Sequence, residues 1–317
     1  MGDILIGTEA VASGIVTSHQ LRHWYRPIYP NVHAPRGREL TLTDRAVGAW
    51  LWSKRRGIIT GLAAAALHGS CWIDHDVDVE LIYKCPRPPR GSIARNERIS
   101  PDEWQEQRGL PVANPARTAF DLGRFQRRHY AVAQLDALMR VRPYALEDVM
   151  MLAKRYRGRH GVARLKAVLP LVDGGAMSPR ETFWRLLVID AGFPRPTTQI
   201  PVLDEFGQPV RMLDFGWEDF KVALEYDGDQ HQSDGCRPGT NAEPTRPLPQ
   251  CPPHRPAGTD SRLSCRRRTT DRASGRRRPH SHRSPRVQPL RPADCAHSAP
   301  GRTRLRRLRP SRSCDRV

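Results

Sequence analysis

The stretch ALEYDGDQH, residues 223–231, combines a strand pattern with groups that could do chemistry. Apolar and acidic residues alternate as far as Asp227, and a glycine, a second aspartate and a histidine follow. Upstream, Asp214 interrupts the otherwise apolar strand pattern of residues 209–217. Because side chains alternate across a strand, a hairpin of these two segments would bring Asp214 and Glu225 onto one face. Carboxylates on a buried sheet are costly unless a cation or hydrogen-bond donors hold them.

These residue types fit a divalent-metal site. Oxygen ligands favour Mg²⁺, or the similar Mn²⁺, and such ions are usually bound through one or two carboxylates together with substrate phosphates. We therefore expect Asp214 and Glu225 to be metal ligands. His231 is placed to protonate a leaving oxygen or to orient a water molecule. The alternative interpretation is a solvated hairpin end with incidental acidic residues.

A helix is predicted directly before these strands, in SPRETFWRLLVIDAG, residues 178–192. Ser178, Pro179 and Glu181 fit the N-cap, the first and the third helical positions of a capping box, and Gly192 fits the end of the helix. Glu181 therefore has a structural explanation, and a catalytic role is the second interpretation.

The charge of the chain is unevenly distributed. The formal net charge is +19, but residues 235–317 contain 21 arginines and no lysine against five acidic residues, so the first 234 residues are nearly neutral. The same segment contains 13 of the 29 prolines and no Phe, Tyr, Trp, Ile or Met. A segment so poor in large apolar residues cannot offset its chain entropy by burial, and we expect it to be disordered.

Two interpretations of residues 235–317 compete. One is an Arg-rich arm that binds phosphates. The other is an out-of-frame translation of a GC-rich gene, because the composition changes abruptly after Asp234 and a natural basic arm normally includes lysine. We favour the out-of-frame interpretation.

The first 175 residues predict a mixture of helices and strands. Helices are expected at residues 15–24, with Thr17 or Ser18 as N-cap, at 41–56, with Thr43 or Asp44 as N-cap, and at 59–69. A short hairpin is expected at 25–35 and a strand at 77–84. Four further helical patterns follow, at residues 114–125, 130–140, 145–156 and 161–172. Two helices followed by a β-wing is the order of a winged-helix module, whose second helix can enter a major groove. The alternative is a small α+β domain with no DNA role.

The motifs EAVASGIVTSHQLRHWYRPIYPNVHAP, GIITGLAAAALHG and GLPVANPARTAFDLGR resemble the antitoxin of type IV abortive-infection toxin–antitoxin systems. The resemblance covers about the first 125 residues. It implies an N-terminal winged helix that binds operator DNA, and a cognate toxin protein as partner.

Residues 178–231 resemble a domain related to the very-short-patch-repair endonucleases, which have the restriction-endonuclease-like fold. The motifs are SPRETFWRLL, VRMLDFGW and VALEYDGDQH. The resemblance implies that Asp214 and Glu225 are metal ligands, that Asp227 assists at the same edge, that His231 transfers a proton and that Glu181 lies nearby. The family's following helix and last core strand do not appear after Asp234, as expected for a truncated or frameshifted domain.

We thus expect an α+β protein with a winged-helix-like antitoxin-type domain at residues 1–90 and a helical continuation at 91–175. An incomplete endonuclease-like α/β domain follows at 176–234, then a disordered basic tail at 235–317. The leading function is a Mg²⁺-dependent DNA endonuclease-like protein, inactive if its nuclease domain is incomplete. The alternative is a non-enzymatic DNA-binding antitoxin or regulator.

DNA is the expected partner in both cases. The sequence contains no run of 18 apolar residues, so no membrane span is predicted. The seven cysteines form no CxxC pair, and only Cys71 and Cys85 lie in the first 234 residues, which favours a reduced, cytoplasmic protein.

Overall fold

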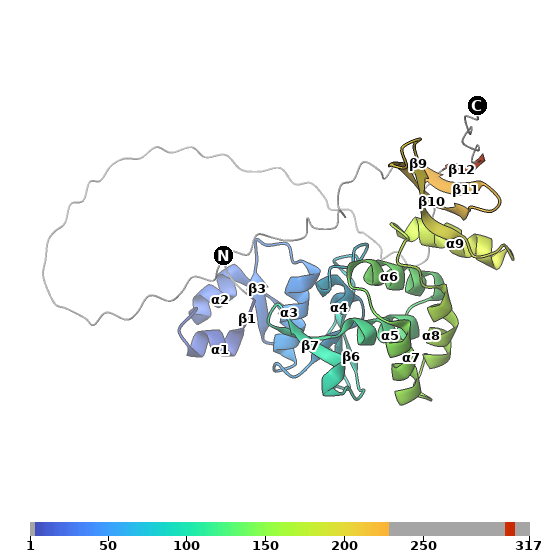
Figure 1. Ribbon diagram of the computed structural model, residues 1–317. Coiled ribbons are helices and arrows are strands. Elements are labelled where there is room, and N and C mark those ends of the chain that lie inside the picture. Colours follow the sequence, from blue (N-terminus) through green and yellow to red (C-terminus); the bar gives the residue numbers. More distant parts are fainter. Residues whose placement is uncertain (1–3, 228–301, 308–317) are drawn as a thin grey trace, which may run out of the picture. The chain divides into compact units, whose positions relative to one another are not determined.

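A computed structural model describes residues 4–227 and 302–307 (Figure 1). The N-terminal part is small and begins with a strand, two short helices and a hairpin: β1 (Leu5–Ile6), α1 (Gly7–Ala12), α2 (Ser18–Trp24), β2 (Tyr25–Tyr29) and β3 (Val32–Pro35). The three strands form an antiparallel sheet in the order β1-β3-β2. The helix expected at 15–24 and the hairpin expected at 25–35 are thus confirmed, whereas α1 was not expected. Thr17 is the N-cap of α2, which confirms one of the two expected caps.

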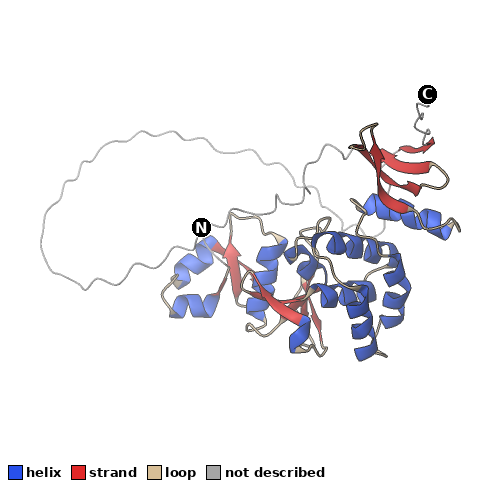
Figure 2. Cartoon of the chain, in the orientation of Figure 1, coloured by secondary structure: helices blue, strands red, loops and turns tan. Residues whose placement is uncertain are grey.

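The middle part alternates helices with short strands (Figure 2). Its first half contains α3 (Leu42–Trp52), β4 (Ile58–Thr60), α4 (Gly61–Leu67), β5 (Val79–Ile82), β6 (Ser92–Arg95), β7 (Trp104–Gln107) and β8 (Leu110–Ala113), with a 3₁₀ turn at Pro101–Glu103. The second half is helical: α5 (Pro115–Phe125), α6 (Arg128–Val141), α7 (Leu146–Arg155) and α8 (Val162–Val168), followed by a 3₁₀ turn at Leu169–Leu171.

The strands of the middle part form a mixed sheet in the order β6-β5-β4-β8-β7. Strand β4 pairs antiparallel with β5 and parallel with β8. Two apolar clusters flank this region. One joins α3, α4 and the central strands, around Ile59, Leu67 and Leu81, and the other joins α4 to the helices α5–α8, around Phe120 and Leu135.

Several of these elements differ from the sequence-based expectation. Strands β6, β7 and β8 were not expected, because four residues are too few to produce a clear alternation. The helix expected at 59–69 begins only at Gly61, since Ile58–Thr60 form β4 and Gly61 has a positive φ of 61°. Helix α3 is capped by Thr41 rather than by Thr43 or Asp44. The Thr41 side chain accepts a hydrogen bond from the backbone of Asp44, whose carboxylate accepts one from Thr41 in return.

The C-terminal part consists of α9 (Pro179–Asp190) and a sheet of β9 (Thr197–Leu203), β10 (Pro209–Trp217), β11 (Val222–Asp227) and β12 (Arg302–Arg307). Ser178 caps α9 and Pro179 is its first residue, as predicted. The sheet order is β12-β11-β10-β9 and all its pairings are antiparallel.

Strand β12 corrects the expectation that residues 235–317 lack regular structure throughout. Residues 302–307 pair with the whole of β11, from Val222 opposite Arg307 to Asp227 opposite Arg302. The other residues expected to form a tail without structure lie outside the described ranges. A helix that could span a lipid bilayer is not found among the described residues.

Helix α9 is attached to α6 by buried polar contacts. Asp136 accepts hydrogen bonds from the Arg185 guanidinium at 2.7 Å, the Thr182 hydroxyl at 2.8 Å and the backbone N–H of Asp173 at 2.7 Å. Asp136 and Arg185 are almost fully buried, and Leu186 joins the apolar cluster of the middle helices. This part of α9 therefore shares the core of the helices that precede it.

Asp136 makes the stability of the protein depend on pH. Burial raises the pKa of this carboxyl to about 6, although Arg185 and the other hydrogen-bond donors act against the shift. Protonation then favours the folded state, so the free energy of unfolding should fall by about 3 kcal/mol as the pH rises from 4 to 6. We expect Asp136→Asn, which does not titrate, to lose this dependence. Urea unfolding of both proteins between pH 4 and 7 measures it, and a constant difference between them across that range would contradict the prediction.

Candidate functional site

The predicted carboxylates lie on the sheet of the C-terminal part. Strands β10 and β11 pair with Phe215 opposite Leu224, so the next position along the ladder places Asp214 opposite Glu225. Directly opposite residues of an antiparallel pair share a face and have Cβ atoms about 4.5–5.5 Å apart. The hairpin expected from the sequence is thus formed. Asp214 also accepts a hydrogen bond from the backbone N–H of Tyr226 at 2.7 Å, and this bond holds its carboxylate at the junction of the two strands.

Glu181 lies at the start of α9 and is largely buried. Its carboxylate accepts hydrogen bonds from the backbone N–H of Met177 at 2.8 Å and from the Ser178 hydroxyl at 2.9 Å. Burial raises the pKa of Glu181, and the negative charge of Asp214 raises it further, while the bond from Met177 lowers it. Ser178 thus caps α9 by accepting from the N–H of Glu181, while the Glu181 carboxylate binds the N–H of Met177 rather than that of the N-cap, and the charge of Asp214 acts on this carboxyl.

Two further residues at these carboxylates were not anticipated. Arg211 donates a hydrogen bond to Glu225 at 2.9 Å, so part of the local negative charge is already balanced. Gln199, in β9, has a φ of 53°, which is uncommon for a residue other than glycine, and its amide approaches Glu181 at 3.5 Å. Arg211 stands three residues before Asp214 in the sequence, a spacing that could have drawn attention to it, whereas nothing in the sequence marks Gln199.

The two remaining predicted residues are Asp227 and His231. Asp227 is the last residue of β11, and His231 lies outside the described residues. Within residues 4–227 and 302–307, no three His, Cys, Asp or Glu side chains gather as they would to hold a metal ion. The donor set on the described hairpin is thus a pair of carboxylates. Such a pair still fits Mg²⁺, which binds through one or two carboxylates and keeps water or substrate phosphate as its other ligands.

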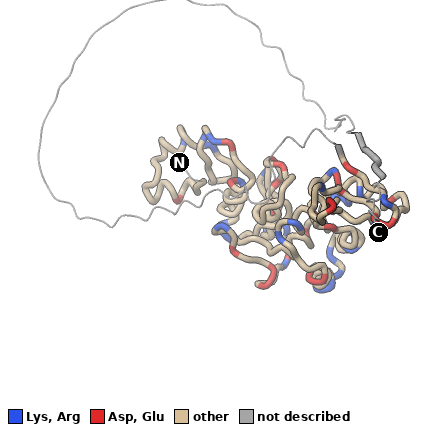
Figure 3. Tube along the Cα trace, turned by 45° about the horizontal axis from the view of Figure 1, so that its top comes forward, with Lys and Arg blue, Asp and Glu red and all other residues tan. Residues whose placement is uncertain are grey.

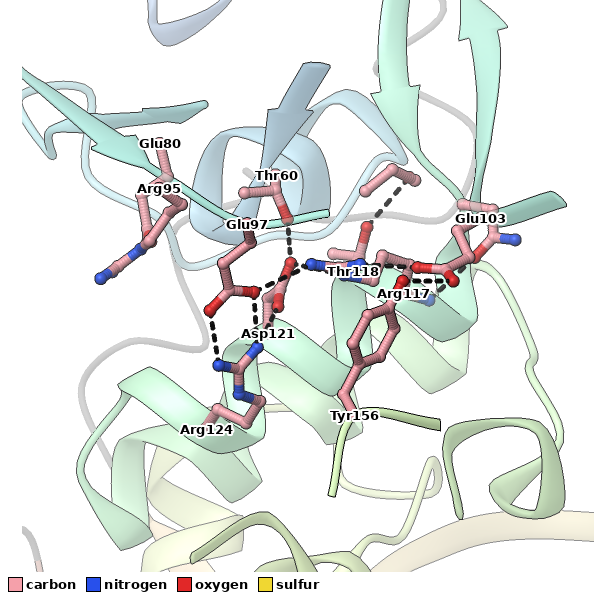
Figure 4. A network of polar contacts seen from close by, with 12 residues as sticks. Thr60, Glu80, Arg95, Glu97, Glu103, Arg117, Thr118, Asp121, Arg124 and Tyr156 are labelled. Carbon is pink, nitrogen blue, oxygen red and sulfur yellow. Dashed lines mark hydrogen bonds and ion pairs between the residues drawn. The ribbon is translucent and has the colours of Figure 1, made fainter. Parts of the chain in front are cut away.

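A second polar cluster, which sequence reasoning missed, lies at α5 (Figure 4). Arg117 and Arg124 are completely buried on this helix, on either side of the buried Asp121. Arg117 donates to Asp121 at 3.0 Å and to Glu103 at 2.6 Å, and Arg124 donates to Glu97 at 2.7 and 2.9 Å. This network attaches the segment between β6 and β7 to α5.

The network pairs three carboxylates with three arginines once Arg155, which bonds to Glu103 at 2.6 Å, is included. Complete burial raises the pKa of Asp121, although the positive charge of Arg117 and a 2.6 Å hydrogen bond from Thr60 lower it. Desolvation is the largest influence on Glu97 and raises its pKa, but the bonds and charges of Arg124 and Arg117 outweigh it, so the net shift is downward. Each buried charge thus has opposite charges and donors around it, as an interior site requires. The geometry of this network therefore indicates a structural role.

The N-terminal part presents a surface that could contact a partner. His19, Arg22 and His23 are exposed on α2, and Trp24 at its end is 62% exposed. Arg36, beyond the hairpin, donates a hydrogen bond to the backbone carbonyl of Arg22 at 3.1 Å. Elsewhere basic and acidic segments are mixed along the described trace (Figure 3). Phosphate contact at this surface would therefore depend on a few residues.

The comparison with protein families gives a match to the middle of the chain. Residues 49–171 match the family described as the AbiEi antitoxin C-terminal domain. This range contains the end of α3, the mixed sheet with the α5 network, and the helices α5–α8. This match supports the resemblance of the N-terminal half to an antitoxin.

Curated relatives come from Mycobacterium tuberculosis. The chain is 37% identical over 134 residues to "Uncharacterized protein MT2308" of strain CDC 1551 / Oshkosh, and equally to "Uncharacterized protein Rv2248" of strain ATCC 25618 / H37Rv. Each match covers 42% of this chain and 46% of the relative. The chain thus spans about half the length of the curated relatives that it matches.

Proposed function

We propose that the protein is a non-enzymatic DNA-binding regulator of the antitoxin kind, with a cognate toxin as its partner. The observation that carries this proposal is the match of residues 49–171 to an antitoxin domain. A small module of two helices and a hairpin stands directly before that domain, which is the order of elements in a winged helix. In this proposal the N-terminal module contacts operator DNA, and the middle part supports it.

Contacts with the middle part hold the N-terminal module in place. Tyr29, at the end of β2, is buried in the apolar cluster of α3 and α4, and its hydroxyl donates to the carbonyl of Gly91 at 3.1 Å. Arg55 forms an ion pair with Glu9 of α1 at 2.6 Å. A module held in this way presents α2 and the hairpin to DNA in a fixed orientation.

Arg22 is the cationic side chain that α2 offers to a phosphate. We expect Arg22→Ala to weaken the binding of DNA from upstream of the protein's own coding sequence, and to reduce the slope of log K against log salt by about 1. Arg159→Ala, which removes the same charge from an exposed position after α7, is the matched control and should leave both quantities unchanged. Gel shifts at several salt concentrations measure the effect. Equal binding by the wild type and Arg22→Ala would count against α2 as the contact.

A second candidate function is metal-dependent phosphodiester hydrolysis at the C-terminal sheet. It is favoured by the register of β10 and β11, whose next position places Asp214 opposite Glu225, and by the influence of the Asp214 charge on the pKa of Glu181. In this proposal Asp214 and Glu225 hold Mg²⁺ or Mn²⁺, and Asp227 assists at the same edge. A bound ion would stabilise charge on the scissile phosphate and activate water.

The protein's own residues would do the rest of the chemistry. His231 would donate a proton to the leaving oxygen. Glu181, whose raised pKa reflects its burial beside Asp214, would accept or hold a proton near the same group. Arg211 would have to move from Glu225 when the ion binds, because both use the same carboxylate.

Calorimetry with Mn²⁺ tests this candidate directly. We expect the double variant Asp214→Asn, Glu225→Gln to lose the binding that the wild type shows. Asp219→Asn, in the exposed turn between the same strands, is the matched control and should bind like the wild type. Incubation with supercoiled DNA then separates the two functions. Cleavage that needs Mg²⁺ and Asp214 supports the enzyme, whereas metal-independent gel shifts without cleavage support the regulator.

A further inference from the structure

The outward face of α2 carries two histidines that neither proposed function uses. His19 and His23 lie one helical turn apart and both are exposed. Their rings stack, with centroids 4.5 Å apart and planes inclined by 19°. Among the described residues, neither imidazole forms a hydrogen bond or an ion pair. The ring nitrogens are therefore open to a ligand from solution, and because both side chains are exposed, the rings can rotate out of this stack until one in-plane lone pair of each meets the same ion.

The backbone that carries these histidines is fixed at both ends. At the start of α2, Thr17 and Gln20 exchange hydrogen bonds of 3.1 and 2.8 Å in a capping box. At its end, the carbonyl of Trp24 accepts a hydrogen bond from the backbone of Arg36 at 2.8 Å. Leu21 lies on the inner side, beside Gly7. The separation of the two imidazoles is thus set by a helical turn that has little freedom to change.

Two histidines four residues apart on one helical face are an arrangement that binds zinc in other proteins. Imidazole nitrogen is a good ligand for Zn²⁺, Ni²⁺ and Cu²⁺, and a poor one for Mg²⁺. We propose that His19 and His23 together chelate a divalent transition-metal ion of this imidazole-preferring class. The site is separate from the carboxylates of β10 and β11 in both position and ligand type, and it does not depend on either proposed function.

The affinity of the site comes from chelation by two groups. No group of three metal-binding side chains is found in the described parts of the chain, so water completes the coordination of the ion. Once one imidazole binds, the second binds within the same molecule, at a high effective concentration. Linking two ligands in this way strengthens binding by about 100-fold over either alone.

Calorimetric titration of the full chain with Ni²⁺ tests the proposal. We expect His19→Ala and His23→Ala each to weaken one binding event by about 100-fold. His75→Ala, which removes another exposed histidine from the loop before β5, should bind like the wild type. All three positions are exposed, so the variants should fold, and circular dichroism verifies that they do.

Because the chain contains twelve histidines, a second measurement locates the ion. Trp24 follows His23 directly, so paramagnetic Ni²⁺ at the site should broaden its indole N–H resonance, which Trp24→Phe assigns. The broadening should be present in the wild type and in His75→Ala, and absent in His19→Ala at the same metal concentration. Equal affinity in the wild type and both α2 variants, or an unbroadened Trp24 signal in the metal-saturated wild type, would overturn the proposal.

Discussion

Replacing Arg117 by alanine should lower the melting temperature by roughly 6–20 °C, because removing one partner of a buried ion pair costs about 3–5 kcal/mol. Arg117 is completely buried, and its guanidinium bonds to Asp121 and Glu103, which are themselves 1% exposed. Without it, both carboxylates lose a counter-charge that water cannot replace. The total stability of a domain is only about 5–15 kcal/mol, so a substantial part of it depends on this one side chain.

Arg155 provides the matched control for Arg117. It also bonds to Glu103, at 2.6 Å, but its own side chain is 46% exposed. Because water reaches the Arg155 guanidinium and screens its charge, Arg155→Ala should lower the melting temperature by at most a few degrees, much less than Arg117→Ala. Scanning calorimetry of both variants makes the comparison. Similar losses in the two would show that burial of the network does not determine its contribution.

The second large effect is expected at the contact between α6 and α9. Arg185→Ala removes the guanidinium from the buried Asp136 and also its 2.8 Å bond to the carbonyl of Leu171. We expect a loss of about 3–5 kcal/mol at neutral pH. The loss should shrink at pH 5, because Asp136 is then largely protonated and needs its counter-charge less.

Arg128 joins the same two helices and serves as the control. It bonds to Asp190 of α9 through two hydrogen bonds of 2.7 Å, but both side chains are more than one third exposed. Arg128→Ala should therefore change the free energy of unfolding far less than Arg185→Ala does. Urea unfolding measures both variants, and hydrogen exchange of the α9 amides shows whether the helix has separated. A greater loss of unfolding free energy in Arg128→Ala than in Arg185→Ala would contradict the conclusion that the buried ion pair holds α9 to α6.

The elements that the sequence predicted well are those with strong local signals. Ser178 and Thr17 cap their helices because a hydroxyl just before an apolar repeat satisfies an otherwise unpaired N–H. The β10–β11 hairpin and the shared face of Asp214 and Glu225 follow from alternation alone. These features depend on neighbouring residues, and a single sequence contains that information.

The features that were missed depend on contacts distant in sequence. The sequence of β4 predicts the start of a helix, since its three residues become a strand only by pairing with β5 and β8. Arginine is almost never fully buried unless it is paired, so Arg117 and Arg124 were not expected in the interior. Their partners Glu97 and Glu103 lie beyond two strands, and no local pattern connects them. The pairing of β12 with β11 was missed because the composition of residues 302–307 resembles no ordinary strand.

The α5 network also determines where the chain can change in length. Arg117, Asp121 and Arg124 are spaced by four and three residues, which places all three on one face of the helix. One residue inserted between Asp121 and Arg124 would rotate Arg124 by about 100° and turn it away from Glu97. The number of residues in this helix is therefore constrained as strictly as their identity. By contrast, the exposed turn at residues 204–208 between β9 and β10 can accept insertions, because lengthening it displaces no buried group.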